Sequence, residues 1–272
     1  MNQHPNVNPA PDEDNDDEMV GTLLSRRRAL RLLGLGGGAA LAAGSVLAQR
    51  NPPPGGQPGG MGASGTSAGT SGATSLPGCV VRPAQTEGPY FIEEKLNRSD
   101  IRKDSKTGKA RPGIPLTIDF VVSKVTVGSC TPRSRVLIDI WQCDALGVYS
   151  DVSGNTDDFL RGSQVTNAQG RVSFTTIYPG WYTGRAVHIH FKLRPLDASG
   201  KATGEFTSQL FFPETVTDAA HAVAPYSSKG KRNTLNSTDS IYRNGGNQLM
   251  LNLTGTPQKG YRATFDVGLN IG

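Results

Sequence analysis

The sequence predicts an all-β fold: an antiparallel β-sandwich with long loops and at most one short helix. Two features of the chain after residue 76 lead to this prediction. Runs rich in Val, Ile, Thr, Phe and Tyr alternate with a period of two, and turn residues separate them, as in Asn167-Ala168-Gln169-Gly170 and Asp197-Ala198-Ser199-Gly200. Strands do not alternate with helices, which disfavours a parallel sheet.

Seven segments fit the strand pattern, because each is rich in β-branched and aromatic residues and ends at a cluster of turn residues. They are Leu116–Val127, Val136–Gln142, Arg171–Ile177, Ala186–Arg194, Thr207–Phe212, Gln248–Leu253 and Tyr261–Ile271. Val216–Val223 is the one segment that looks helical, and it is short. Seven short strands joined by turns are typical of a sandwich or a barrel.

The chain divides into three parts by composition. Its 272 residues contain 34 Gly and 18 Pro, and residues 49–75 hold a large share of them, with one charge and no aromatic residue. Such a segment cannot bury enough apolar area to offset the entropy of ordering it, so we expect a disordered linker here. Residues 76–272 follow as one domain, long enough for a hydrophobic core without metal or disulfide support.

Residues 1–48 are expected to be a signal peptide of the twin-arginine type. An acidic stretch at residues 12–18 precedes the basic Ser25-Arg26-Arg27-Arg28-Ala29-Leu30-Arg31, and a weakly hydrophobic Gly/Ala-rich run ends at Val46-Leu47-Ala48, an A-x-A-like cleavage site. The arginine pair resembles a twin-arginine signal, so we expect export to the periplasm or the cell exterior. A retained N-terminal anchor is the alternative; after cleavage, no stable membrane span is expected.

The net charge of +5 does not by itself indicate nucleic-acid binding. Basic residues beyond residue 80 are scattered, and their densest group, Lys229-Gly230-Lys231-Arg232, has no interleaved aromatic residues. We therefore expect a solvated loop there and no nucleic-acid partner. Only one apolar stretch approaches the length of a membrane span, and it lies near the N-terminus, which excludes a multi-span membrane protein.

Three cysteines are present, at Cys79, Cys130 and Cys143. An exported protein meets an oxidising environment, so one disulfide is expected. Cys79 and Cys130 both lie beside turn residues, so we pair these two and expect Cys143 to be free and buried. No two cysteines are close in sequence, which disfavours a cysteine-based metal site.

The strongest chemical signal is the pair of histidines in Val187-His188-Ile189-His190-Phe191. On a strand, alternate side chains point to the same side, so both imidazoles face one way while the apolar residues face the core. Two neutral nitrogen donors about 7 Å apart along a strand suit one metal ion. The alternative is two exposed or hydrogen-bonded histidines without a metal.

Candidate ligands to complete such a site lie upstream. No carboxylate follows the histidines until Asp197, which disfavours a cupin-like or zinc site. Tyr182 lies six residues before His188, and Tyr149 follows an expected strand. A phenol with its ordinary pKa of about 10 is a poor ligand, but a trivalent iron lowers that pKa enough to hold a phenolate at neutral pH.

Five blocks of sequence occur in a characteristic order. They are Thr86-Glu87-Gly88-Pro89-Tyr90, Asp139-Ile140-Trp141-Gln142-Cys143-Asp144-Ala145-Leu146-Gly147-Val148-Tyr149-Ser150, Pro179-Gly180-Trp181-Tyr182, Arg185-Ala186-Val187-His188-Ile189-His190-Phe191 and Ser208-Gln209-Leu210-Phe211-Phe212. In this order they resemble the intradiol ring-cleavage dioxygenases, the family of catechol and protocatechuate 3,4-dioxygenases. The resemblance extends over about residues 79–271 and so over nearly the whole expected domain.

The resemblance implies a β-sandwich and a non-haem Fe(III) cofactor. The ligands that it implies are Tyr149, Tyr182, His188 and His190. It also implies that Arg185 stabilises negative charge on the substrate ring, that Gln209 lines the pocket, and that Tyr182 is the tyrosinate that the substrate displaces. The implied activity is intradiol cleavage of a catechol-type diol by O2 to a muconate-type diacid. Tyr90 is expected to line the pocket without binding metal.

The sequence departs from the family pattern at two places near the site. Ala186 stands where a proline often follows the active-site arginine, and the connection from Tyr182 to Arg185 is only Thr183-Gly184. The short connection puts protocatechuate in doubt as the substrate and leaves catechol, hydroxyquinol and larger plant-derived diols.

Two other readings stay open beside the enzyme. One is an exported transthyretin-like or carbohydrate-binding sandwich without a metal, and the other is an iron-binding homologue without turnover. A homo-oligomer is also compatible with the sequence.

Overall fold

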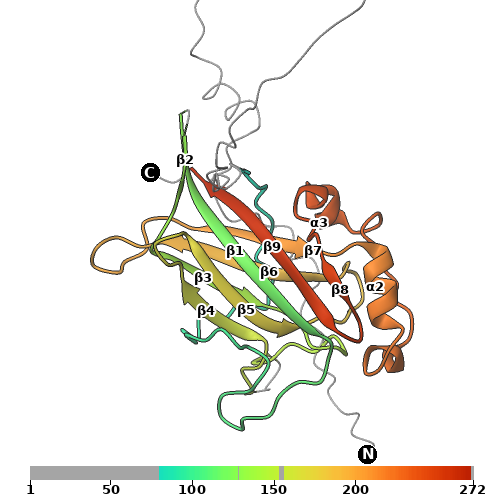
Figure 1. The fold of residues 1–272 in the computed structure, drawn as a ribbon. Helices are drawn as coiled ribbons and strands as arrows, with labels where there is room; N and C mark the ends of the chain where they lie inside the picture. Colours follow the sequence, from blue (N-terminus) through green and yellow to red (C-terminus); the bar gives the residue numbers. More distant parts are fainter. Residues whose placement is uncertain (1–79, 128, 153–155, 271–272) are drawn as a thin grey trace, which may run out of the picture.

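The computed structural model describes residues 80–127, 129–152 and 156–270 (Figure 1). The expected signal peptide (1–48), the expected linker (49–75) and Cys79 lie outside the described residues, as does the expected end of the last strand at Ile271. Within these ranges, no helix has the length and apolar character needed to cross a membrane.

Two β-sheets stack face to face, which confirms the predicted sandwich (Figure 1). The first sheet has the order β2-β1-β9-β8, with β5 paired to β1, and the second has the order β4-β3-β6-β7. The strands are β1 (Pro115–Thr126), β2 (Ser129–Pro132), β3 (Val136–Trp141), β4 (Arg161–Val165), β5 (Arg171–Ile177), β6 (His188–Pro195), β7 (Phe206–Phe211), β8 (Thr254–Thr256) and β9 (Gly260–Leu269). The named strands pair antiparallel except β1 and β9, which pair in parallel.

Helical residues gather on one side of the sandwich, beside β7 and β8 (Figure 1). Helix α2 (Glu214–His221) confirms the expected short helix and begins two residues before it. Helix α3 (Ser240–Arg243) is a single turn, and η2 (Tyr226–Lys229) and η3 (Gly246–Gln248) are 3₁₀ turns.

The strand expected at Gln248–Leu253 is wrong. Gly245 has a φ of 103° and introduces the turn η3, and one parallel bridge between Met250 and Phe211 is the contact of this segment with β7. Its alternating pattern arises because Leu249 and Leu251 are buried in the core, and the segment does not pair as a β-strand along its length.

Three short strands, β2, β4 and β8, were not expected from the sequence. Strand β4 reads Arg-Gly-Ser-Gln-Val and lacks the apolar alternation that marks the others, because buried polar side chains fill its positions. The expected turn before β5 is confirmed: Asn167 Oδ1 accepts hydrogen bonds from the N–H groups of Gln169 and Arg171 (3.0 and 2.9 Å). Gly170 ends this turn with a φ of 70°, where a Cβ would lie 2.3 Å from Val122 O.

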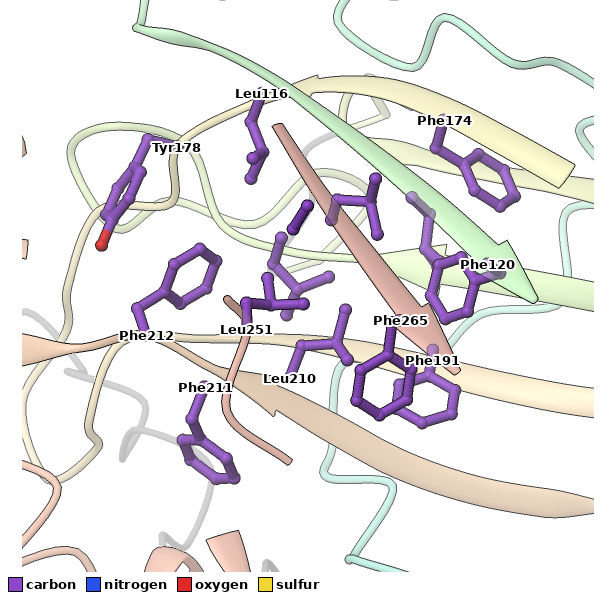
Figure 2. Packing of buried hydrophobic residues seen from close by; sticks show 14 of the residues in the cluster. Leu116, Phe120, Phe174, Tyr178, Phe191, Leu210, Phe211, Phe212, Leu251 and Phe265 are labelled. Atoms are coloured by element: carbon purple, nitrogen blue, oxygen red, sulfur yellow. The ribbon is translucent and has the colours of Figure 1, made fainter. Parts of the chain in front are cut away.

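The core lies between the two sheets. Strand β1 alternates so that Leu116, Ile118, Phe120 and Val122 all point inward and are fully buried. Phe120 packs against Phe191 of β6, with ring centres 5.5 Å apart, and both rings contact Phe265 of β9 (Figure 2). This cluster holds the inner face of β6 in place.

The outer face of β6 is buried as well, because the segment of residues 85–91 runs over it. Gln85 N–H donates to Thr207 O of β7 at 3.1 Å, which ties the segment to the sheet edge. Farther along, the Lys192 ammonium lies 3.8 Å from the centre of the Phe91 ring. A strand that is covered on both faces offers a water-poor environment to the polar side chains on its outer side.

Candidate metal centre

The two histidines on the outer face of β6 turn their rings toward each other. His188 Nε2 and His190 Nε2 are 3.0 Å apart, and both side chains are almost fully buried. Strand alternation accounts for their common direction, since Ile189 between them points into the core. The two imidazoles face one way as predicted, but their Nε2 atoms lie 3.0 Å apart and not about 7 Å, because the rings turn toward each other.

A backbone contact determines which nitrogen of His188 is available. His188 Nδ1 lies 2.7 Å from Ala186 O, and a carbonyl can only accept, so Nδ1 carries the proton. Burial, and then the nearby Arg185, lowers the pKa of His188 to about 3. The ring is therefore neutral at physiological pH, and its Nε2 lone pair faces the centre.

His190 is also neutral. Burial, followed by the neighbouring His188 and Arg185, holds its pKa well below the ordinary value. Its ring stacks on Trp141 of β3, with centres 4.9 Å apart and an angle of 8° between the planes. Two neutral imidazoles with facing Nε2 atoms form an arrangement that a cation shared between them would stabilise.

Tyr182 and Tyr149 complete the group of donors, from two different loops. Tyr182 Oη lies 3.2 Å from His188 Nε2, and its ring is half-buried. Tyr149 is 5% exposed, and its ring centre lies 5.8 Å from that of Tyr182 and 6.5 Å from that of His190. Burial, and then the proximity of Tyr182, raises the pKa of Tyr149 well above its ordinary value. This phenol becomes a phenolate only beside a strong positive charge.

Hydrogen bonds join the two loops that carry these tyrosines. Asp144 Oδ1 accepts from Leu146 N–H and Val148 N–H (2.9 and 3.0 Å), which closes the turn before Tyr149. Asp144 O accepts from Gly180 N–H at 3.0 Å, two residues before Tyr182. One aspartate therefore links the two loops that carry the phenols.

The four candidate donors fit a trivalent metal. The part of the chain that the structure describes holds no cluster of three or more His, Cys, Asp and Glu side chains, and the phenols of Tyr182 and Tyr149 are the oxygen donors that lie beside these histidines. Two neutral nitrogens and two phenols supply two negative charges once the phenols ionise. Hard anionic oxygens of this kind suit a hard trivalent cation better than they suit zinc.

Comparisons with known proteins identify the family of the chain. The family model described as Dioxygenase matches residues 86–269. An intradiol ring-cleavage dioxygenase from Tetranychus urticae has a similar structure, with 30% identity, a TM-score of 0.61, and coverage of 71% of this chain and 95% of that one. This chain belongs to the intradiol ring-cleavage dioxygenase family.

Other relatives have a lower TM-score or align over a smaller part of the chain. The dioxygenase domain of a carbohydrate-binding fusion from the cellulolytic bacterium Streptomyces sp. SirexAA-E is 32% identical, with a TM-score of 0.51 and coverage of 71% of this chain and 100% of that one. Catechol 1,2-dioxygenase 1 of Acinetobacter lwoffii is 27% identical over 46% of this chain and 45% of its own length. The protocatechuate 3,4-dioxygenase beta chain of Burkholderia cepacia is 31% identical over 46% and 57%. This chain thus spans about half the length of these last two enzymes.

The predicted pocket residues Arg185 and Gln209 lie together beside the histidines. Arg185 Nη2 donates to Gln209 Oε1 at 2.6 Å, and Gln209 Nε2 donates to Thr86 O at 3.0 Å. Both side chains are buried, so neither is an ordinary surface position of a strand. Asp239, which the sequence analysis missed, accepts from Arg185 Nε at 3.1 Å.

Tyr90 packs against both tyrosines of the candidate centre. Its ring stacks on Tyr149 at 4.3 Å, and its edge faces Tyr182 at 6.1 Å. Its carbonyl accepts from Arg161 Nη1, and the same guanidinium donates to the Oγ and O of Ser150. Arg161 was also missed, because β4 was not recognised as a strand; an arginine in the apolar run Phe159-Leu160-Arg161-Gly162 was the available signal.

The cysteines behave as expected where the structure describes them. Cys143 is free and buried close to Tyr149 and Trp141, and burial raises the pKa of its thiol to about 12. Cys130 is disulfide-bonded. The expected partner, Cys79, lies outside the described residues.

Proposed function

We propose that this intradiol dioxygenase binds one non-haem ferric ion through Tyr149, Tyr182, His188 and His190. With O2 it cleaves the ring of a catechol-type diol between the two hydroxylated carbons and releases a muconate-type diacid. The observation that carries the proposal is the meeting of His188 Nε2, His190 Nε2 and Tyr182 Oη, with the first lying within 3.2 Å of both others.

The two tyrosines are proposed to have different roles because their environments differ. A ferric ion held by these four residues would supply Lewis-acid chemistry toward the diol. Tyr182 is half-buried on a loop, so it can swing away and take up a proton from the incoming diol. Tyr149 is buried under Tyr90 and keeps its place.

Arg185 is proposed to stabilise negative charge on the bound diol. Its guanidinium is buried beside the histidines and is held by Gln209 and Asp239. A fixed cation in a water-poor site acts on developing charge more strongly than the same cation in water. Gln209 keeps the guanidinium in place through its own bond to Thr86 O.

The short connection from Tyr182 to Arg185 is the feature that counts against protocatechuate, although the Lys229 ammonium lies at the other tyrosine loop, where it donates to Leu146 O. The Thr183-Gly184 connection is short and exposed, and it supplies no cation to bind a ring carboxylate. Leu146 and Val148, on the loop of Tyr149, are 43% and 46% exposed. These features support catechol, hydroxyquinol or a larger plant-derived diol as substrate. We also propose export by the twin-arginine signal, which transports folded protein and so is compatible with metal loading before export.

One preparation of the protein tests the activity. We expect one iron per chain, a red-brown colour from tyrosinate-to-iron charge transfer, a colour change on addition of catechol, and oxygen uptake with formation of a diacid. A colourless protein without iron would support the metal-free sandwich module. Colour without oxygen uptake would support an iron-binding homologue that has lost turnover.

A further inference from the structure

Asp239 connects the candidate centre to a part of the chain far away in sequence. It is the N-cap residue of α3, and its side chain is fully buried. One carboxylate oxygen, Oδ1, accepts from Ile241 N–H and Tyr242 N–H at 2.7 and 2.9 Å. The other, Oδ2, accepts from Arg185 Nε at 3.1 Å and Ala186 N–H at 2.7 Å.

Capping the helix does not require the second oxygen. A serine or threonine hydroxyl caps a helix N-terminus as well as one carboxylate oxygen does. The second oxygen instead faces the two residues that precede the histidine strand. A buried carboxylate is costly unless it is paired, and here the paired group is the guanidinium of Arg185.

The contact with Arg185 determines the orientation of its guanidinium. Nε is bound to Asp239 and Nη2 is bound to Gln209, so two acceptors from different elements define the plane of the group. Arginine presents its donors in a rigid planar fork, so two such bonds leave little rotational freedom.

The contact with Ala186 reaches the histidine. The Ala186 N–H is bound to Asp239, and the Ala186 carbonyl accepts the proton of His188 Nδ1 at 2.7 Å. Asp239 therefore holds the backbone N–H of Ala186, and the carbonyl of that same residue fixes the tautomer and the ring orientation of His188. Groups that hold the second nitrogen of a metal-binding histidine commonly tune metal affinity.

We propose that Asp239 is a positioning residue with two linked effects: it orients Arg185 toward the substrate, and through Ala186 it keeps His188 Nε2 directed at the metal. The inference rests on the proposed function for the role of Arg185. The effect on His188 does not need a metal to be present.

The substitution Asp239→Ser tests both effects, because serine keeps the helix cap and removes Oδ2. In the metal-free protein, ¹⁵N NMR of the imidazoles should show His188 changing from one tautomer to a mixture. Loss of iron to a chelator should become about 10- to 100-fold faster. The kcat should fall by about 10- to 100-fold with a smaller change in KM, because a displaced guanidinium weakens stabilisation of the transition state.

A matched control is Asp197→Ser. Asp197 also accepts two backbone N–H groups, from Ser199 and Lys201 at 2.9 Å each, at a turn beyond the far end of β6. This variant should keep the tautomer of His188, the iron and the kcat of the unsubstituted protein. If Asp239→Ser gives the same results as this control, the proposal is overturned.

A double variant separates the two effects and protects against a folding failure. Asp239→Ser leaves a buried guanidinium without its carboxylate, whereas Arg185→Gln with Asp239→Ser leaves no unpaired charge. In the Arg185→Gln background, adding Asp239→Ser should change kcat less than about twofold but should still accelerate iron loss. Equal losses of kcat in both backgrounds would overturn the role through Arg185, and unchanged iron loss would overturn the role through His188. Failure of the proposed function shows itself separately, as absence of iron and oxygen uptake in the unsubstituted protein.

Discussion

Replacing His190 by alanine separates metal binding from folding. His190 is 1% exposed and stacks on Trp141, so truncating its side chain leaves a cavity between β6 and the segment of residues 85–91 that covers it. Loss of a buried ring of this size lowers the free energy of unfolding by about 2 kcal/mol. Removal of the buried Nδ1, which has no hydrogen-bond partner in the described part of the chain, raises it by about 1 kcal/mol. The metal-free variant should therefore remain folded, about 1–2 kcal/mol less stable than the unsubstituted protein.

The two proteins should differ more in the presence of iron. A ligand at 100 times its Kd stabilises the folded state by about 2.7 kcal/mol. For a domain of this size, about 1 kcal/mol corresponds to a shift in Tm of about 2–4 °C. The unsubstituted protein should gain about 5–10 °C in Tm with Fe(III), and His190→Ala should gain almost nothing and retain no iron. Calorimetry with and without the metal, together with iron analysis, measures both quantities.

His221→Ala provides the matched control. His221 is also a partly buried imidazole stacked on an aromatic ring, Tyr226 at 5.3 Å, and its Nε2 lies 3.0 Å from Pro179 O. It has no contact with the histidine pair, so its variant should lose stability but keep iron and its Tm gain. If His190→Ala still binds one iron per chain, or if His221→Ala loses the metal equally, the assignment of the ligands is refuted.

Four further predictions test other parts of the reasoning. Tyr182→Phe should keep some iron through the three remaining donors but lose about 100-fold in kcat, because no phenolate is left to accept the substrate proton; an unchanged kcat contradicts this role. Burial, and then a hydrogen bond with Asp151, raises the pKa of Glu94 to about 7, so the unfolding free energy should fall as pH rises from about 4.5 through 7, and Glu94→Gln should remove that dependence in urea titrations. Cys143 should resist iodoacetamide in the native protein and react on unfolding, since its thiol is buried with a pKa of about 12; rapid native labelling contradicts this. Changing Arg26, Arg27 and Arg28 to lysine should stop export in a cell fractionation assay, and undiminished export excludes the twin-arginine route.

The sequence predicted what depends on local pattern. Alternation placed the two imidazoles on one face of β6, and the structure has them there with their Nε2 atoms 3.0 Å apart. The two tyrosines lie on loops, where no periodicity indicates direction, so their position upstream of the histidines only suggested them, and the resemblance to a family singled them out from the seven in the chain. The parallel pairing of β1 with β9 joins strands from opposite ends of the domain, and no local signal predicts a pairing over that distance.

The same limit explains the residues that were missed. Asp239 lies 54 residues from Arg185, and its neighbours in sequence form a polar turn that looks like a solvated loop. Arg161 belongs to β4, which lacks the alternation that marks a strand, and its contacts with Tyr90 and Ser150 join segments far apart in sequence. Residues that support a site without facing its centre are recognised by their contacts with residues distant in sequence, and the sequence alone does not show these contacts.

The candidate centre combines two donors on a rigid strand with two donors on loops. The imidazoles stand on a strand covered on both faces, and hydrogen bonding at Ala186 fixes one of them before any metal binds. The phenols stand on loops, one buried under Tyr90 and one half-exposed. A centre that must both retain a metal and admit a substrate needs at least one donor that can leave at low cost. Tyr182 has the least burial of the four proposed donors, so under the proposed function its displacement would disturb the packing least.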